Sequence, residues 1–133
     1  MSVSNPNRFV LDTNIVTAFF KKEQVIGEAI HQAERVYLPI TVLGELHFGA
    51  RKSPHPQIHL QRITRFLLLV EVVHITQETA EIYGDIKAFL EARGQPIPDN
   101  DLWIAASALE YGLPLASRDQ HFPRVPKLSV LTW

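Results

Sequence analysis

Four acidic residues carry the chemistry that this sequence suggests, and each lies where an apolar run meets a different kind of segment: Asp12, Glu45, Asp101 and Asp119. Successive members are 33, 56 and 18 residues apart, so no local motif joins them. Ionised carboxylates rarely lie against core segments unless something pairs with them. If the fold gathers these four side chains, we expect the cluster to bind a divalent cation.

Carboxylates held close together repel one another, which limits what such a cluster can do. Two unit charges about 4 Å apart, at an effective dielectric constant near 20, interact by roughly 4 kcal/mol. Either some carboxylates stay protonated or a cation neutralises them. Oxygen ligands favour Mg²⁺ or Mn²⁺ over zinc. Because such ions polarise a phosphodiester and lower the pKa of a bound water, the pattern predicts metal-assisted phosphodiester hydrolysis without a covalent nucleophile.

Short apolar runs alternate with helix-like stretches along the chain. Strands are predicted at residues 9–11, 36–38, 72–75, 115–117 and 128–131. Helices are predicted at 15–33 with a break near 21–23, from Pro39 onward through Glu45, and at 57–69, 76–93 and 101–111. Such alternation is typical of an α/β fold with helices on both faces of a parallel sheet. Its sites lie at the carboxyl ends of the strands, near the topological switch point, where all four carboxylates can converge.

Simpler roles compete with metal binding at some of these positions. Asp12 could cap a helix or a turn at the end of its strand, and Asp119 could equally be the N-cap of a short helix. Asp99 and Asn100 are interpreted as loop and capping residues rather than ligands. Asp101 lies on the core-facing side of its helix by i, i+3, i+4 spacing, where a charge without a partner is costly.

The charge distribution adds a second candidate region. The chain has 13 Lys and Arg residues and 14 Asp and Glu residues, so its formal net charge is −1. Without the four acidic residues described above, 10 acidic residues remain against the 13 basic ones. Residues 46–70 contain no Asp or Glu but include Arg51, Lys52, Arg62 and Arg65. We expect this segment either to contact nucleic-acid phosphates or to be a solvated helical hairpin, and the sequence favours neither.

Composition places the chain in a broad class. Its 133 residues predict one domain, 1–133, and 46% hydrophobic content argues against disorder. With no cysteine, thiolate ligands are excluded and a reducing cytoplasm fits. Residues 1–8 lack the apolar core of a signal peptide, and the apolar run at 66–70 is too short to span a membrane. The six histidines form no metal cluster by their spacing.

Four segments of this chain strongly resemble the PIN-domain nucleases and, within them, the VapC-type toxins of bacterial toxin–antitoxin pairs. They are residues 10–14 (Val-Leu-Asp-Thr-Asn), 38–50 around Gly-Glu-Leu, 99–108 beginning Asp-Asn-Asp-Leu-Trp, and 113–126 around Ser-Arg-Asp. They occur in the family's order along nearly the whole length, so the resemblance is specific.

The resemblance implies a three-layer α/β/α PIN-like domain with a mostly parallel sheet of four to five strands. It further implies an endoribonuclease that depends on Mg²⁺ or Mn²⁺, acts on tRNA or rRNA, and uses the four carboxylates as catalytic and metal-binding residues. Asn14 and Ser117 match positions that orient ligands or metal-bound water, although the family often has Thr at the second. The family also implies a homodimer and a small antitoxin, whose C-terminal segment enters the active-site groove and which often contacts the region of residues 46–70.

Two other classes of function remain open at this stage. The carboxylates could hold a structural cation in a non-catalytic interaction module. Alternatively, Asp12 could accept a phosphoryl group, as in receiver-like domains. The second alternative is weakened because the first strand lacks a neighbouring acid pair and no clear Lys lies on a late strand.

Overall fold

A five-stranded sheet in the order β3-β2-β1-β4-β5 forms the centre of the molecule in this computed structural model, which describes residues 7–133. Its strands are β1 (Arg8–Leu11), β2 (Arg35–Pro39), β3 (Glu71–Val73), β4 (Leu115–Ala116) and β5 (Val130–Leu131). All neighbouring strands in this order pair in parallel. The five predicted strands are therefore confirmed, with bounds that shift by one or two residues.

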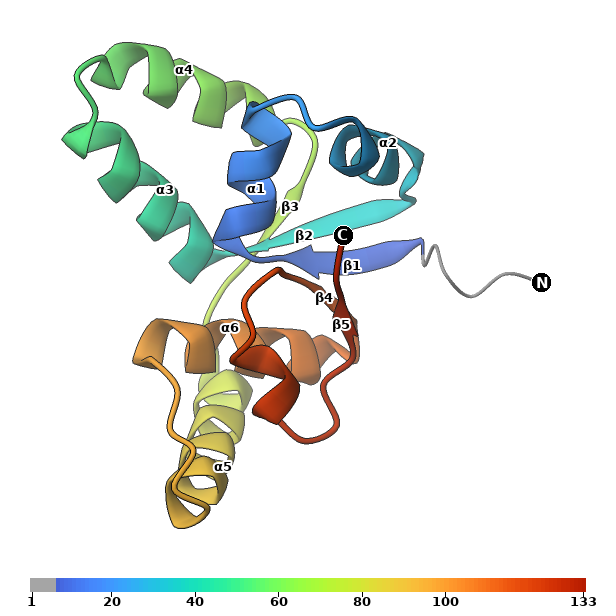
Figure 1. Cartoon of the computed structure of the whole chain (residues 1–133), viewed down its shortest axis with the longest axis vertical. Helices are drawn as coiled ribbons and strands as arrows, with labels where there is room; N and C mark the ends of the chain where they lie inside the picture. Colours follow the sequence, from blue (N-terminus) through green and yellow to red (C-terminus); the bar gives the residue numbers. More distant parts are fainter. Residues whose placement is uncertain (1–6) are drawn as a thin grey trace.

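Helices cover both faces of the sheet, as expected for a three-layer α/β/α fold. One side carries α1 (Thr13–Phe20), α2 (Gln24–Gln32), α3 (Ile40–Lys52) and α4 (Pro56–Phe66). The other carries α5 (Gln77–Ala92), α6 (Asp99–Tyr111) and the short 3₁₀ helix η1 (Phe122–Arg124), as Figure 1 shows. The division follows from connectivity: the chain steps from β1 to β2 to β3 in one direction and then crosses back to β4, so right-handed crossovers place α5 and α6 on the opposite face.

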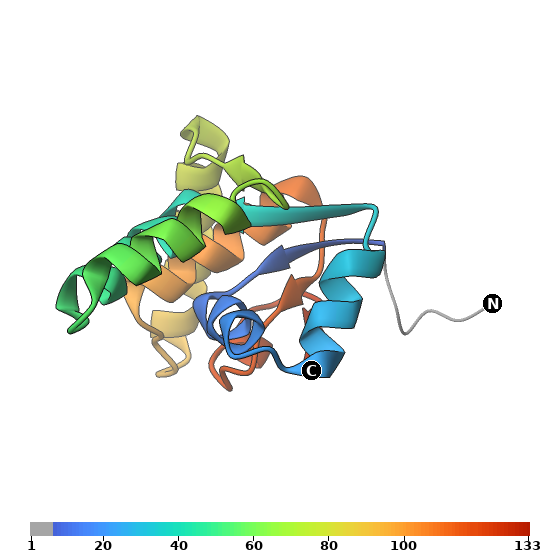
Figure 2. The same ribbon diagram turned by 90° about the horizontal axis from the view of Figure 1, so that it is seen from above.

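The strand order reverses between β1 and β4, and this switch point brings two distant segments side by side. The backbone N–H of Asp12 donates to the carbonyl of Ala116 at 3.0 Å. Figure 2 shows the strands pointing toward the end of the molecule from which α3 and α4 project as a hairpin. Loops that follow β1 and β4 therefore meet at that end of the sheet, where α/β folds place their sites.

Small residues allow α6 to pack on several neighbours at once. Ala105, Ala106 and Ala108 are fully buried, and Ser107 is nearly so. The Oγ of Ser107 donates to the carbonyl of Trp103 at 3.0 Å, so its buried hydroxyl is satisfied within the helix. α6 thus sits close to both the sheet and α5, which fixes the position of its first turn and of Asp101.

Among the predicted helix ends, the start of α6 and the end of α4 differ from the structure by two and three residues. α6 begins at Asp99 rather than 101, so Asp99 and Asn100 lie in its first turn instead of the preceding loop. An acidic residue is favourable there because of the helix dipole, and Asp99 also pairs with Lys87 at 3.2 Å. α4 ends at Phe66, three residues earlier than predicted.

Other boundaries agree with their sequence signals. Thr76 is the N-cap of α5 in a reciprocal capping box with Thr79, and Gly112 ends α6 with φ of 64°. Among residues 7–133, no helix combines the length and apolar character needed to cross a bilayer. The expectation that residues 1–8 carry no signal-peptide core falls mainly on residues 1–6, which lie outside the described part.

Candidate active site

The four predicted carboxylates line one open cleft of about 490 Å³. Asp12 follows β1, Glu45 lies in the middle of α3, Asp101 occupies the first turn of α6, and Asp119 follows β4. Four segments far apart in the sequence thus deliver one carboxylate each. Their convergence depends on the switch point, because β1 and β4 are neighbours only in the folded sheet.

Asp12 has the capping role that its sequence position suggested, and its side chain also lines the cleft. It is the N-cap of α1, where its Oδ1 accepts a hydrogen bond from Thr13 N at 2.7 Å. Its Oδ2 accepts a second from Ser117 Oγ, also at 2.7 Å. The residue is only 5% exposed, so both bonds hold the carboxylate rigidly at the floor of the cleft.

Glu45 is positioned by a residue that the sequence reasoning missed. Thr13 Oγ1 donates to Glu45 Oε1 at 2.8 Å, which links the start of α1 to the middle of α3. Thr13 therefore holds two carboxylates, through its backbone N–H and its hydroxyl. In the sequence, the only sign of a role for Thr13 was its place in the Asp-Thr-Asn motif. The partner of its hydroxyl, Glu45, is identified only by the tertiary contact.

The turn after β4 is organised by Ser117 and Asp119. Ser117 Oγ accepts a hydrogen bond from Asp119 N at 2.9 Å while it donates to Asp12. Asp119 Oδ1 accepts from His121 N at 2.9 Å, a local turn rather than a helix N-cap, since the N-cap of η1 is His121. Asn14 also contacts this turn, because its Oδ1 accepts from Arg118 N at 3.3 Å.

Asp101 is the least compensated carboxylate of the cleft. Its side chain is 15% exposed, and no group among residues 7–133 donates a hydrogen bond to it. Burial, followed by the charges of Asp119 and Asp12, raises the pKa of Asp101 from 3.8 to about 6, and nearby His121 opposes that rise. Burial also raises the pKa of Asp12, although its hydrogen bonds from Ser117 and Thr13 counteract the effect.

His121 joins the cluster although histidine spacing gave no reason to expect it. Its Nδ1 lies 2.9 Å from Asp119 Oδ1 and 3.5 Å from Asp101 Oδ2. One ligand atom from each of the three residues falls within 4.8 Å of the others. The sequence did offer one sign of this contact, because Asp119 and His121 are only two residues apart. Comparing the spacing of histidines with one another does not reveal it.

The basic side chains predicted to contact RNA lie outside the lining of this cleft. Arg51 and Lys52 occupy the last turn of α3, and Arg62 lies on α4 with its guanidinium over the Phe20 ring at 5.7 Å. Two cationic residues line the cleft, Lys21 and Arg118, and the Arg118 guanidinium donates to both carboxylate oxygens of Glu23 at 2.6 and 3.2 Å. Among the described residues, no Lys or Arg forms an ion pair with the four carboxylates.

The donor set fits a divalent cation. Four carboxylates at one cleft supply the oxygen ligands that Mg²⁺ and Mn²⁺ prefer. Asp101 lacks a hydrogen-bond donor, and the buried Nδ1 of His121 also has no hydrogen-bond partner among the described residues. A positive charge at this position would relieve the repulsion that raises the pKa of Asp101.

Comparison with known proteins agrees with this geometry. The PIN domain family matches residues 9–128. A protein named ribonuclease VapC2 from Haemophilus influenzae is 32% identical over 129 residues, which are 95% of this chain and 98% of the relative. The tRNA(fMet)-specific endonuclease VapC of Salmonella typhimurium is 30% identical over the same shares. The solved structure of VapBC2 from Rickettsia felis bound to a DNA fragment from its promoter superposes with a TM-score of 0.88 at 27% identity, covering 95% of this chain and 98% of that one.

The raised pKa of Asp101 predicts how the stability of the metal-free protein depends on pH. A carboxyl whose pKa is higher in the folded state stabilises the fold fully below its unfolded pKa of about 3.8, and that stabilisation disappears as pH rises through about 6. At pH 7 the ionised Asp101 carboxylate makes the folded state less stable than it is at acid pH, by at most about 3 kcal/mol. Asn carries no charge, so Asp101→Asn avoids this destabilisation. In chelator, we therefore expect the variant to melt at a higher temperature than the wild type at pH 7 and at a similar temperature at pH 4.

Asp85→Asn is the matched control, because Asp85 is exposed on α5 and its neutralisation should change little. A melting temperature for Asp101→Asn at or below that of the wild type at pH 7 would show that the carboxylate is not destabilising in the folded state.

Proposed function

This chain belongs to the PIN domain family and, within it, to the VapC-type ribonucleases, and on that premise we propose a divalent-metal-dependent mechanism that uses the acidic cleft. As an endoribonuclease toxin, it hydrolyses phosphodiester bonds in RNA. The proposal extends to the substrate class, tRNA or rRNA, since a relative 30% identical is named as a tRNA(fMet)-specific endonuclease. One observation carries it: four carboxylates from distant segments line one cleft at the switch point of the sheet.

Each side chain of the cleft has a role in this proposal. Asp12, Glu45, Asp101 and Asp119 hold the cation, which when bound polarises the scissile phosphodiester and lowers the pKa of an attacking water. Ser117 and Thr13 fix the directions of the Asp12 and Glu45 carboxylates through their hydroxyls. Asn14 steadies the turn that carries Asp119 by accepting from Arg118 N. These supporting contacts preserve the ligand geometry while substrate binds and leaves.

The main alternative is a non-catalytic module of the same fold that only binds a cation. Metal binding alone does not separate the two, because both predict that a cation stabilises the fold. RNA cleavage does separate them, and so the test must measure both quantities on the same variants.

We predict that Asp12→Asn, Glu45→Gln and Asp101→Asn each lower RNA cleavage by at least about a hundredfold with the fold intact. Outer partners of metal ligands already contribute about 10–100-fold, and direct ligands should contribute more. Mg²⁺ or Mn²⁺ should raise the melting temperature of the wild type, corresponding to about 2.7 kcal/mol at a hundredfold excess over Kd, and that of Asp101→Asn much less.

Cleavage rates on a defined RNA, circular dichroism and thermal melting measure these outcomes, with Asp85→Asn as the isosteric control on α5. Near wild-type cleavage by Asp101→Asn would refute the catalytic role. Metal-dependent stabilisation without any cleavage by the wild type would favour the non-catalytic module.

We further propose that the acid-free segment 46–70, which runs from the second half of α3 through α4, guides RNA toward the cleft. Arg51 and Lys52 are exposed in the last turn of α3, which projects beyond the carboxyl ends of the strands (Figure 2). No acidic residue between 46 and 70 offsets their charge. Lys and Arg in such a position contact phosphates and contribute affinity rather than chemistry.

For this hairpin, we expect Arg51→Ala and Arg62→Ala to weaken RNA binding while the single-turnover rate at saturation stays nearly unchanged. Each lost contact to a single-stranded phosphate should flatten the slope of log K against log salt by about 0.7. Fluorescence anisotropy on the free toxin measures both quantities, and Arg93→Ala on α5 is the control. Unchanged affinity and slope would mean that the hairpin is only a solvated face.

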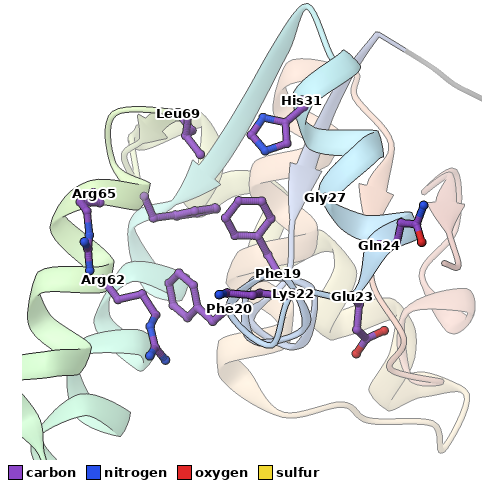
Figure 3. Close-up of a pocket in the computed structure, with 11 residues that line it drawn as sticks. Phe19, Phe20, Lys22, Glu23, Gln24, Gly27, His31, Arg62, Arg65 and Leu69 are labelled. Carbon is purple, nitrogen blue, oxygen red and sulfur yellow. The ribbon is translucent and has the colours of Figure 1, made fainter.

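A second cleft, of about 620 Å³, offers a docking surface for the antitoxin partner that we propose from the toxin–antitoxin relatives. The rings of Phe19 and Phe20 form its floor and lie between Arg62 and Arg65 of α4 and His31 of α2, as Figure 3 shows. Apolar rings flanked by basic groups complement a segment with apolar and acidic side chains.

The two clefts adjoin at Glu23, which lines both. A single antitoxin segment could therefore place apolar and acidic side chains over the phenylalanine rings and a basic side chain among the carboxylates. That arrangement would neutralise the acidic cleft and exclude RNA from it, which gives a physical reason for inhibition by a partner.

Gly27→Leu tests this docking surface. Gly27 lines the second cleft on α2, and a Cβ added there meets nothing within 4 Å, so a larger side chain should fill the cleft without disturbing the fold. We expect calorimetry to show at least about tenfold weaker antitoxin binding, a loss of roughly 1.4 kcal/mol, with RNA cleavage retained. Gly84→Leu on α5, also open around its Cβ, should bind as the wild type does. Equal affinity for both variants would place the antitoxin elsewhere.

The homodimer stays a prediction from the resemblance, and the organisation of residues 1–133 as one domain stays a prediction from chain length. Large apolar side chains that are exposed in the isolated chain, among them Leu68 and Phe48, are candidates for burial between two copies.

A further inference from the structure

His121 occupies a position between two of the proposed metal ligands. It is the residue before η1, and its Nδ1 faces Asp119 Oδ1 at 2.9 Å and Asp101 Oδ2 at 3.5 Å. Although the side chain as a whole is 40% exposed, the Nδ1 atom itself is buried. The imidazole thus directs its inner nitrogen at the carboxylates and leaves the rest of its ring toward solvent.

This nitrogen is close to a carboxylate without being hydrogen-bonded to it. The direction of approach does not meet hydrogen-bond geometry, so Nδ1 has no hydrogen-bond partner among residues 7–133. A buried polar atom left without a hydrogen-bond partner is destabilising. Imidazole nitrogen is also the commonest metal ligand in proteins. A cation between the carboxylates would satisfy an atom that the protein itself leaves unpaired.

The separations among the three donor atoms match those of ligands around one ion. With metal–ligand distances of about 2.0–2.1 Å in an octahedral site, adjacent ligand atoms lie about 3 Å apart. The Nδ1 separations of 2.9 and 3.5 Å are close to that value, and all three atoms fall within 4.8 Å of one another. Small adjustments of the side chains would let the three donors share an ion.

The backbone holds His121 in this place. Its N–H donates to Asp119 Oδ1 at 2.9 Å, and Asp119 N in turn donates to Ser117 Oγ. The following residue, Phe122, is fully buried and anchors the other side of the turn. The imidazole is therefore presented by a short, pinned loop rather than by a mobile surface segment, as a ligand position requires.

We propose that His121 binds the divalent cation of the cleft directly through Nδ1, together with Asp101 and Asp119. This inference rests on the metal dependence proposed above and adds a nitrogen to what the sequence suggested was an all-oxygen site. A nitrogen ligand shifts selectivity away from Mg²⁺ toward transition-metal ions, because Mg²⁺ is bound almost only by oxygen.

Pulsed electron paramagnetic resonance of Mn²⁺ bound to the full chain without an affinity tag tests this directly. We expect the wild type to show coupling between the electron spin and a ¹⁴N nucleus, which changes when the histidines are labelled with ¹⁵N. His121→Asn should lose the coupling, and its Mn²⁺ affinity should fall by about tenfold or more, with a smaller loss for Mg²⁺. His74→Asn, an exposed histidine after β3, is the control and should behave as the wild type does.

The outcomes separate this inference from the proposed function. Bound Mn²⁺ without nitrogen coupling in the wild type would overturn the role of His121 and leave the carboxylate site standing. Coupling that persists in His121→Asn would overturn it as well, since the nitrogen would come from another residue. Failure of Mn²⁺ to bind the wild type would refute both proposals. Because absent nitrogen coupling in the wild type is by itself enough to overturn the role of His121, the proposal can be refuted even if a variant folds poorly.

Discussion

Mutual repulsion among carboxylates at one edge of the sheet is the constraint around which the rest of the site is built. Asp12 tolerates near-complete burial because it accepts one hydrogen bond from the start of α1 and one from Ser117 across the switch point. Asp101 has no such donor among the described residues, and the pKa of its carboxyl rises to about 6. Core packing of α6 nonetheless holds Asp101 in the cleft. The folded state is therefore less stable than it would be without this carboxylate, and packing elsewhere offsets the difference.

The same segments serve both structure and chemistry. Thr13 begins α1 and fixes Glu45, whereas Ser117 follows β4 and bonds both Asp12 and Asp119. Each hydroxyl bridges elements that are distant in the sequence, so a change at either would disturb more than one carboxylate. This sharing explains how a short chain can place four carboxylates in one cleft with few additional residues.

The charges of opposite sign lie in different parts of the molecule. The carboxylates gather at the carboxyl ends of the strands, while the hairpin of α3 and α4, which carries the acid-free segment 46–70, projects beyond them (Figure 2). Arg118, which also lines the cleft, is paired with Glu23 rather than with the four carboxylates. Glu23 also lines the phenylalanine cleft, so it stands between the proposed metal site and the proposed antitoxin surface.

Local patterns determined much of this protein. Alternating strands and helices predicted the parallel sheet, Thr76 and Gly112 marked helix ends, and the four carboxylates were identified by their placement against apolar runs. These features depend on interactions between residues a few positions apart in the chain, so they can be predicted from the sequence alone. The first turn of α6 was misjudged because Asp99 is stabilised there by Lys87, a residue twelve positions away.

Contacts between distant segments were decided only by the tertiary structure. Thr13 meets Glu45 across the ends of the neighbouring strands β1 and β2, and His121 meets Asp101 where the turn after β4 reaches the first turn of α6. Neither pair shares a spacing that a sequence pattern could reveal. Composition states which side chains exist, but the direction of a hydroxyl or an imidazole nitrogen depends on how packed elements turn toward one another. The sequence by itself therefore determined the fold class and the four carboxylates, whereas the partners that orient them arose from the geometry of the folded sheet.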